Sequence, residues 1–175
     1  VCVSERYNAH RATVIGVNLE GKAVFNRWLQ LQAGLTLQKS EYREAVVWDE
    51  NAPAEKRFLR TPDVFADHAA TVPPEKYSSP AITGNYTGGM LVGHAAGSGV
   101  SAPVAVNTPS FTVLNIKLAY DLKLYKTINA EINCGVRNIT NAYQKDIDKG
   151  WERDAAYIYG PSSPRCYFVG MKISY

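Results

Sequence analysis

The sequence predicts an all-β, antiparallel fold of the kind that crosses a membrane as a β-barrel. Two observations favour this fold class. Apolar and polar residues alternate with a period of two in segments of about ten residues. The connections between these segments alternate between short and long. Strands joined by short turns at one end and long loops at the other are typical of outer-membrane barrels.

The clearest alternation lies in residues 28–38, where five apolar side chains share one face and Gln, Gly and Thr occupy the other. Residues 13–20 alternate in the same way, and residues 21–26 offer a turn, so the two segments predict a hairpin. We expect its apolar face to contact lipid. The expected lipid-facing residues are Ile15, Val17, Leu19, Leu29, Leu31, Ala33, Leu35 and Leu37.

Five further strands are predicted, at 62–72, 79–92, 114–120, 128–137 and 167–175. Within the 62–72 and 79–92 pair, His68 falls on the apolar side and Pro80 removes a ladder donor. The polar faces carry charged residues, which we expect to point into a wet interior. Short links are expected at 21–27, 73–77 and 121–126, and long loops at 39–60, 93–108 and 141–162.

Composition excludes several classes of function. The net charge is only +3, and the basic residues are scattered among acidic ones, so nucleic acid is not an expected partner. Cys2, Cys134 and Cys166 form no C-x-x-C pair and have no histidine at ligand spacing, so neither a metal site nor a cofactor is expected. We expect free thiols, with Cys134 and Cys166 on opposite faces of adjacent strands. Catalytic motifs are absent from the sequence, which predicts that the chain is not an enzyme.

The chain also has features of a fragment. It starts without an initiator methionine or a targeting peptide, and seven strands are fewer than a closed outer-membrane barrel needs. We therefore expect residues 1–175 to be the C-terminal piece of a larger barrel, with the remaining strands preceding Val1.

Five stretches resemble the TonB-dependent outer-membrane receptors. They are VIGVNLEG at 14–21, RTP at 60–62, NYTG at 85–88, GVRNITNAY at 135–143, and GPSSPR at 160–165 leading into YFVGMKISY at 167–175. Their order and spacing carry the resemblance. Three residues depart from the usual pattern: Asn18 stands where Glu is usual, Thr140 where Phe is common, and Tyr175 where a terminal Phe is commoner.

The resemblance implies a receptor of about 22 strands in the bacterial outer membrane, of which this chain supplies the last seven. Such a receptor imports a scarce nutrient, such as a ferric siderophore, haem, cobalamin or an oligosaccharide. Its implied partners are outer-membrane lipid, an N-terminal plug and the remaining barrel strands, the TonB energy-transducing complex acting through that plug, and the barrel-assembly machinery. No segment here resembles the plug or the energy-coupling box.

Two sets of residues are candidate functional sites. The 141–162 loop is rich in charges and aromatic rings, and Trp151, Arg153, Tyr157 and Tyr159 are its predicted substrate contacts. The resemblance makes the apolar face of the last strand a barrel-assembly signal, formed by Tyr167, Val169, Met171, Ile173 and Tyr175. Two alternatives remain open from the sequence: a passive porin-like barrel, and a soluble β-sandwich that binds a ligand.

Overall fold

A computed structural model describes residues 11–25, 28–73, 78–97, 99–125 and 127–175. These residues contain ten strands. They are β1 (Ala12–Phe25), β2 (Leu29–Val46), β3 (Glu55–Arg57), β4 (Val64–Thr71), β5 (Ser78–Thr87), β6 (Leu91–His94), β7 (Val104–Asn107), β8 (Phe111–Lys123), β9 (Asn129–Arg137) and β10 (Cys166–Ser174). The strands β3, β6 and β7 are short, and the other seven are longer. None of the described residues lies in a helix long and apolar enough to cross a membrane.

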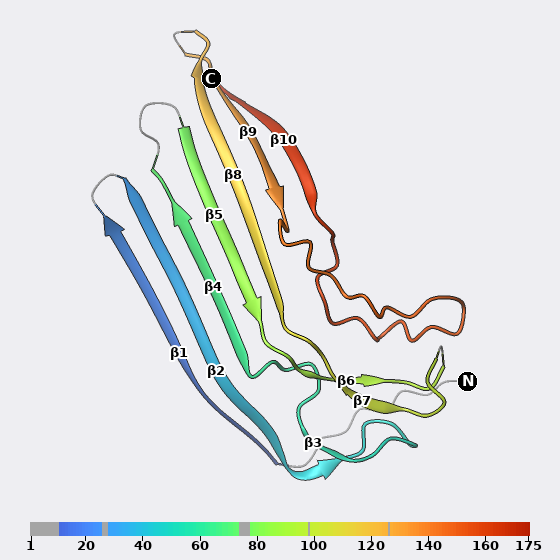
Figure 1. The fold of residues 1–175 in the computed structure, drawn as a ribbon. Helices are drawn as coiled ribbons and strands as arrows, with labels where there is room; N and C mark the ends of the chain where they lie inside the picture. The colour runs from blue at the N-terminus through green and yellow to red at the C-terminus, as the bar shows by residue number, and fades with distance from the viewer. Residues whose placement is uncertain (1–10, 26–27, 74–77, 98, 126) are drawn as a thin grey trace.

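Seven strands form one antiparallel sheet in the order β1-β2-β4-β5-β8-β9-β10, with β3 added beside β2 (Figure 1). Each of the seven pairs with the next one along the chain, as the sequence predicts. Among the described residues β1 pairs only with β2, and β10 only with β9. The sheet is therefore open at both edges.

The alternating pattern places apolar side chains on one face across the whole sheet, called here the apolar face. Directly opposite residues share a face of a sheet, and the register puts Leu19 opposite Leu35, and Leu35 opposite Ala66. The same face continues over the remaining strands through Ala66–Tyr86, Ile82–Ile116, Leu118–Cys134 and Cys134–Val169. The predicted grouping of the apolar residues on one face is confirmed.

The opposite, polar face carries the predicted charged residues. Glu131 is opposite Lys172, and its carboxylate also lies 3.9 Å from Lys117 Nζ. The Arg137 guanidinium lies 5.3 Å from the centre of the Phe168 ring. Cys166 is opposite Arg137, whereas Cys134 is opposite Val169 on the other face, and both thiols are free and exposed. Cys2 lies outside the described residues.

The connections differ in length at the two ends of the sheet, as predicted. Figure 1 shows the ends of β1, β4 and β8 and the starts of β2, β5 and β9 at one end of the sheet, and the small strands β3, β6 and β7 with the connection from β9 to β10 at the other. We call the second end the long-connection end. It is built from three connections, 47–63, 88–110 and 138–165.

Several predicted boundaries were wrong. β1 does not turn at 21–26 but continues to Phe25, with Gly21 paired to Ala33. The glycine was interpreted as a turn, but the long register with β2 holds it in the strand. β2 likewise runs to Val46 and pairs with β3, so half of the predicted 39–60 loop is strand.

The predicted strand at 79–92 is two strands. β5 ends at Thr87, and residues 91–94 form β6, which pairs with β7 in a separate two-stranded sheet inside the predicted 93–108 loop. Two glycines mark the break. A Cβ on Gly89 would lie 2.6 Å from the carbonyl oxygen of Thr108, so only glycine permits this close approach. Pro80 is tolerated because it lies next to the last residue pair of the β4–β5 ladder, Thr71 and Ala81.

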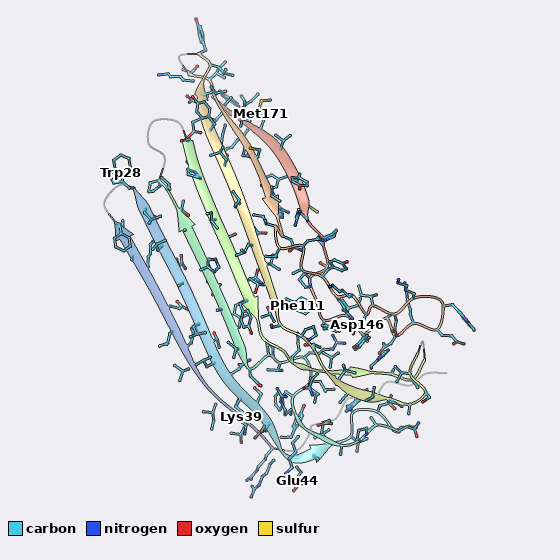
Figure 2. The ribbon with its side chains drawn as sticks, in the orientation of Figure 1. Trp28, Lys39, Glu44, Phe111, Asp146 and Met171 are labelled. Atoms are coloured by element: carbon cyan, nitrogen blue, oxygen red, sulfur yellow. The ribbon has the colours of Figure 1, made fainter. Side chains whose placement is uncertain are left out.

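Most buried side chains lie at the long-connection end. A core of Met90, Val92 and Tyr157 forms there, with Val106 and Tyr159 packed against it. The sheet itself leaves its apolar face exposed: Ile15 is 70% exposed and Val169 is 79% exposed. Figure 2 shows Trp28, the residue before β2, and Glu44, near the end of β2, at opposite ends of this strand.

Candidate ligand-contact site at the long-connection end

The 138–165 connection starts at a buried asparagine. Asn138 has a left-handed backbone, with φ of 52°, a conformation that asparagine adopts more readily than most residues. Its side-chain amide donates to the carbonyls of Ala142 and Ser163, and its oxygen accepts from the Ala142 amide. Asn138 therefore ties the two ends of the connection together. The motif at 135–143 contained this residue, but sequence reasoning gave it no role.

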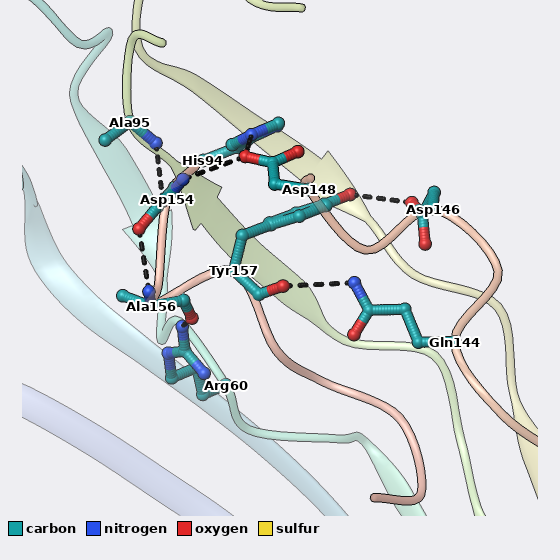
Figure 3. Close-up of polar contacts among 9 residues, drawn as sticks. All are labelled: Arg60, His94, Ala95, Gln144, Asp146, Asp148, Asp154, Ala156 and Tyr157. Atoms are coloured by element: carbon teal, nitrogen blue, oxygen red, sulfur yellow. Dashed lines mark hydrogen bonds and ion pairs between the residues drawn. The ribbon is translucent and has the colours of Figure 1, made fainter. Parts of the chain in front are cut away.

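Tyr157 anchors the middle of the connection to β6. It is only 3% exposed, and its ring stacks on His94 with centroids 3.9 Å apart and an interplanar angle of 8°. Gln144 fixes the backbone nearby, because its amide donates to the Tyr157 carbonyl and its oxygen accepts from the Tyr159 amide. Figure 3 shows the Tyr157 ring between His94 and Gln144. Tyr157 is therefore a packing residue in this structure.

The Asp146 carboxylate accepts hydrogen bonds from two phenolic hydroxyl groups. Tyr157 donates to one carboxylate oxygen at 3.0 Å and Tyr159 to the other at 2.5 Å. Burial alone would raise the pKa of Asp146, but these hydrogen bonds outweigh it and lower that pKa below its usual value. Burial, reinforced by the hydrogen bond to Asp146, raises the pKa of Tyr157 to about 12 and also raises the pKa of Tyr159. Both tyrosines thus stay neutral donors at neutral pH.

A second polar group joins the 138–165 connection to β6. Asp148 accepts from the Asp154 amide at 3.0 Å, and its Oδ2 also lies 2.8 Å from His94 Nε2. These two contacts lower the pKa of Asp148, the backbone hydrogen bond having the larger effect. The Asp154 carboxylate accepts from the Ala95 and Ala156 amides (Figure 3). The acidic residues of the connection therefore hold backbone groups in place.

Arg60 joins the first connection to the third. Its guanidinium donates to the carbonyls of Ile158, at 2.9 Å, and Ala156. The backbone of Arg60 is left-handed, with φ of 59°, and its amide donates to the Leu91 carbonyl. A left-handed arginine is uncommon and costs conformational energy. Here the hydrogen bonds to Leu91, Ala156 and Ile158, which belong to the two other connections, hold Arg60 in this conformation.

Two open cavities flank the first part of the 138–165 connection. One, of about 550 Å³, lies between the start of β8 and the connection, and its walls include Phe111, Tyr143, Lys145 and Tyr159. The other, of about 470 Å³, is more apolar, with Ile147, Ile158 and Pro161 among its lining residues. Aromatic rings beside a lysine can hold a planar or anionic ligand group.

The structure does not bring the four predicted substrate contacts together. Trp151 is 92% exposed in a turn, and Arg153 is also exposed. Tyr157 is buried in the core, and Tyr159 is half-buried and lines the larger cavity. Within the described ranges there is no cluster of His, Cys, Asp and Glu that could hold a metal ion.

Sequence reasoning gave no anchoring role to His94, Gln144, Asp148 or Arg60. Most of their partners lie more than ten residues away along the chain, beyond the reach of a local pattern. A scan against protein-family models gave no match for this chain, and a search of curated proteins found no relative of significant similarity.

Proposed function

We propose that the chain forms the last seven strands of a bacterial outer-membrane barrel belonging to a TonB-dependent receptor, which imports a nutrient such as a ferric chelate, haem or cobalamin. The observation that carries the proposal is the apolar face, which crosses all seven strands and stays exposed. Soluble monomers rarely expose a contiguous apolar surface above a few hundred Å². Lipid acyl chains would cover the apolar face and remove it from water.

The dimensions of the apolar face support this proposal. On β1 it runs from Ile15 to Phe25, about ten residue steps of about 3.3 Å each. Tilted by about 40°, as barrel strands are, this stretch spans about 25 Å, the height of the lipid-facing band of an outer-membrane barrel. The open edges at β1 and β10 are the places where further strands would complete the barrel.

Within this proposal, the polar face lines the interior and contacts an N-terminal plug, through which the energy-transducing complex acts. The long-connection end faces outward and meets the nutrient. Tyr167, Val169, Met171 and Ile173 are exposed along the edge strand β10, and Tyr175 follows them. This accessibility suits an assembly signal that the barrel-assembly machinery binds. Deleting Tyr175 should slow the appearance of assembled receptor in outer membranes, whereas normal kinetics would leave Tyr175 without that role.

The lipid-facing arrangement can be tested with two neighbouring positions. Cys134 lies on the apolar face and Asn133 on the polar face. In full-length receptor carrying a single cysteine at either position, a bimane label on Cys134 should be quenched by lipids with brominated acyl chains, and a label on Asn133→Cys should not. A soluble sandwich predicts no quenching at either position, because its apolar face packs on a second sheet.

Active import separates the receptor from a passive porin-like barrel. Cells with the full-length receptor should accumulate labelled ferric chelates, haem or cobalamin above the external concentration, and an uncoupler of the proton gradient should abolish that accumulation. Uptake that only equilibrates, and that ignores the uncoupler, would favour the porin-like alternative.

A further inference from the structure

The apolar face carries charged residues at one end only. Among the described Asp, Glu, Lys and Arg residues of the seven-stranded meander, those on β4, β5, β8, β9 and β10 all lie on the polar face. The exceptions lie on β2 and immediately before β1, near the long-connection end. They are Arg11, Lys39, Glu41 and Arg43, which we call the basic corner.

The register fixes the position of the basic corner relative to the apolar face. Lys39 is opposite Ile15, the last residue of β1 at this end that lies on the apolar face and is itself apolar, and Glu41 is opposite Thr13. Arg11 and Arg43 follow as the next pair, since the Arg43 amide donates to the Arg11 carbonyl at 2.8 Å. Figure 2 shows Lys39 far from Trp28, near the long-connection end of β2. The charges thus begin where the apolar face ends.

Arg11 and Arg43 are a like-charged cross-strand pair. Side chains directly opposite on antiparallel strands have Cβ atoms about 5 Å apart, and like charges in this position destabilise a sheet. The one carboxylate of the corner, Glu41, already contacts Lys39 Nζ at 3.0 Å. Neither arginine makes an ion pair with a described residue. Both side chains are exposed, so an anion from outside the chain can reach them.

Phosphate is the anion that this arrangement fits best. A guanidinium binds phosphate through two parallel N–H groups, and two neighbouring guanidinium groups can engage one phosphate from both sides. The location selects the source of that phosphate. A lipid whose acyl chains lie along Ile15, Val17 and Leu37 would place its head group at the level of the basic corner. Long basic side chains at such a boundary extend toward the polar layer.

We infer that the basic corner is a binding site for the phosphate of an anionic lipid in the leaflet at the long-connection end. The inference rests on the proposed membrane-spanning function. Arg11 and Arg43 hold the phosphate, beside the Lys39–Glu41 ion pair at the edge of the apolar face. Binding relieves the repulsion between the two arginines and attaches one lipid to the β1–β2 hairpin.

The test uses full-length receptor in nanodiscs, with a bimane label on Thr13→Cys. Thr13 lies on the same face, between Ile15 and Arg11. The probes are phosphatidylglycerol and phosphatidylcholine, each brominated near the start of the acyl chains. We expect phosphatidylglycerol to quench the label at least threefold more efficiently than phosphatidylcholine at equal content, with the preference falling as salt is raised.

The variant Arg11→Gln/Arg43→Gln should remove the preference. The matched control Lys22→Gln/Lys172→Gln removes the same net charge from the polar face and should keep it. Assembly of both variants is checked by heat-dependent migration of the folded barrel.

An unchanged preference in the arginine variant, or equal quenching by both lipids in the parent, overturns the inference. Loss of the preference on adding inorganic phosphate at millimolar concentration and constant ionic strength would also overturn it, because the site would then bind free phosphate. Absence of quenching by either lipid instead refutes the membrane-spanning proposal itself.

Discussion

The seven-stranded sheet and the long-connection end are built on opposite principles. The sheet is regular, and its apolar face is covered by nothing in the described part of the chain, with Ile15 at 70% exposure and Val169 at 79%. The long-connection end is irregular, yet it contains the buried core of Met90, Val92 and Tyr157. Three separate connections meet there through side-chain hydrogen bonds.

The difference shows which region depends on its surroundings. The connections bury their own aromatic and polar groups and should hold their shape in water. The sheet obtains its backbone hydrogen bonds from neighbouring strands, but its apolar side chains need an external apolar phase. Substitutions that act on one region and leave the other unchanged can test this division.

The largest effect is expected from Tyr157→Ala. Removing a buried aromatic ring typically costs about 3 to 5 kcal/mol, and this ring stacks on His94 and packs with Met90 and Val92. We expect faster proteolytic cleavage within the 138–165 connection, with unchanged heat-dependent migration of the barrel. Tyr157→Phe keeps the ring and loses only the hydrogen bond to Asp146, so it should cost about 1 kcal/mol. Loss of the whole barrel in Tyr157→Ala would show that the two regions are not independent.

Ala33→Arg tests the sheet in the same way. Ala33 lies near the middle of the apolar face, opposite Gly21 and His68. In the proposed membrane-spanning arrangement, arginine at the bilayer midplane costs about 2 to 4 kcal/mol, so the amount of assembled protein should decrease while the proteolytic pattern of any assembled fraction stays the same. The control Gln32→Arg, on the polar face, should assemble normally. A harmless Ala33→Arg with a severe Gln32→Arg would reverse the two faces.

A smaller effect is expected at the turn where the sequence predicts ligand contacts. Trp151 and Arg153 are exposed and outside the core, so alanine at either position can weaken binding without disturbing the fold. Contacts of this kind cost about 1 to 2 kcal/mol when truncated, roughly a tenfold loss in affinity. Titration of the purified full-length protein with the proposed nutrient measures this loss, with Glu152→Ala as the neighbouring control. Parent-like affinity in both Trp151→Ala and Arg153→Ala would remove this turn from the contact surface.

The smallest effect concerns pH. Asp146 and Asp148 have pKa values below the ordinary value of 3.8 because neighbouring groups donate hydrogen bonds to their carboxylates. A lowered folded-state pKa stabilises the folded form above the unfolded pKa, and this contribution disappears as the pH falls through the folded pKa. Relative to pepsin cleavage of an unfolded reference protein at the same pH, the connection should therefore be more resistant at pH 4 than at pH 2. The variant Asp146→Asn/Asp148→Asn should show little change over that range, and an equal pH response in both proteins would contradict this cause.

Tyr157 gives the corresponding change at high pH. Its pKa is raised to about 12, so the unfolded chain loses this phenolic proton at lower pH than the folded one. Stability from this residue is complete below pH 10 and declines as the pH rises toward 12. Protease resistance measured at pH 9 and pH 11 should differ more in the parent than in Tyr157→Phe.

The sequence by itself determined the approximate positions of the seven sheet strands and the residues on each of their two faces. Alternation of apolar and polar residues depends only on the geometry of an extended chain, in which neighbouring side chains point to opposite sides. Leu29 to Leu37 could therefore be placed on one face before any partner strand was known. The separation of short and long connections was likewise visible, because it depends only on where alternation stops.

Only the tertiary structure decided the rest. Gly21 belongs to a strand because of its partner Ala33, and residues 91–94 form β6 because β7 lies beside them. The burial of Tyr157 depends on His94, and the backbone of Arg60 depends on carbonyls of the 138–165 connection. Each of these contacts joins segments that are distant along the chain. Local alternation contains no information about such contacts, because their stability comes from packing and hydrogen bonding between segments that meet only in the folded protein.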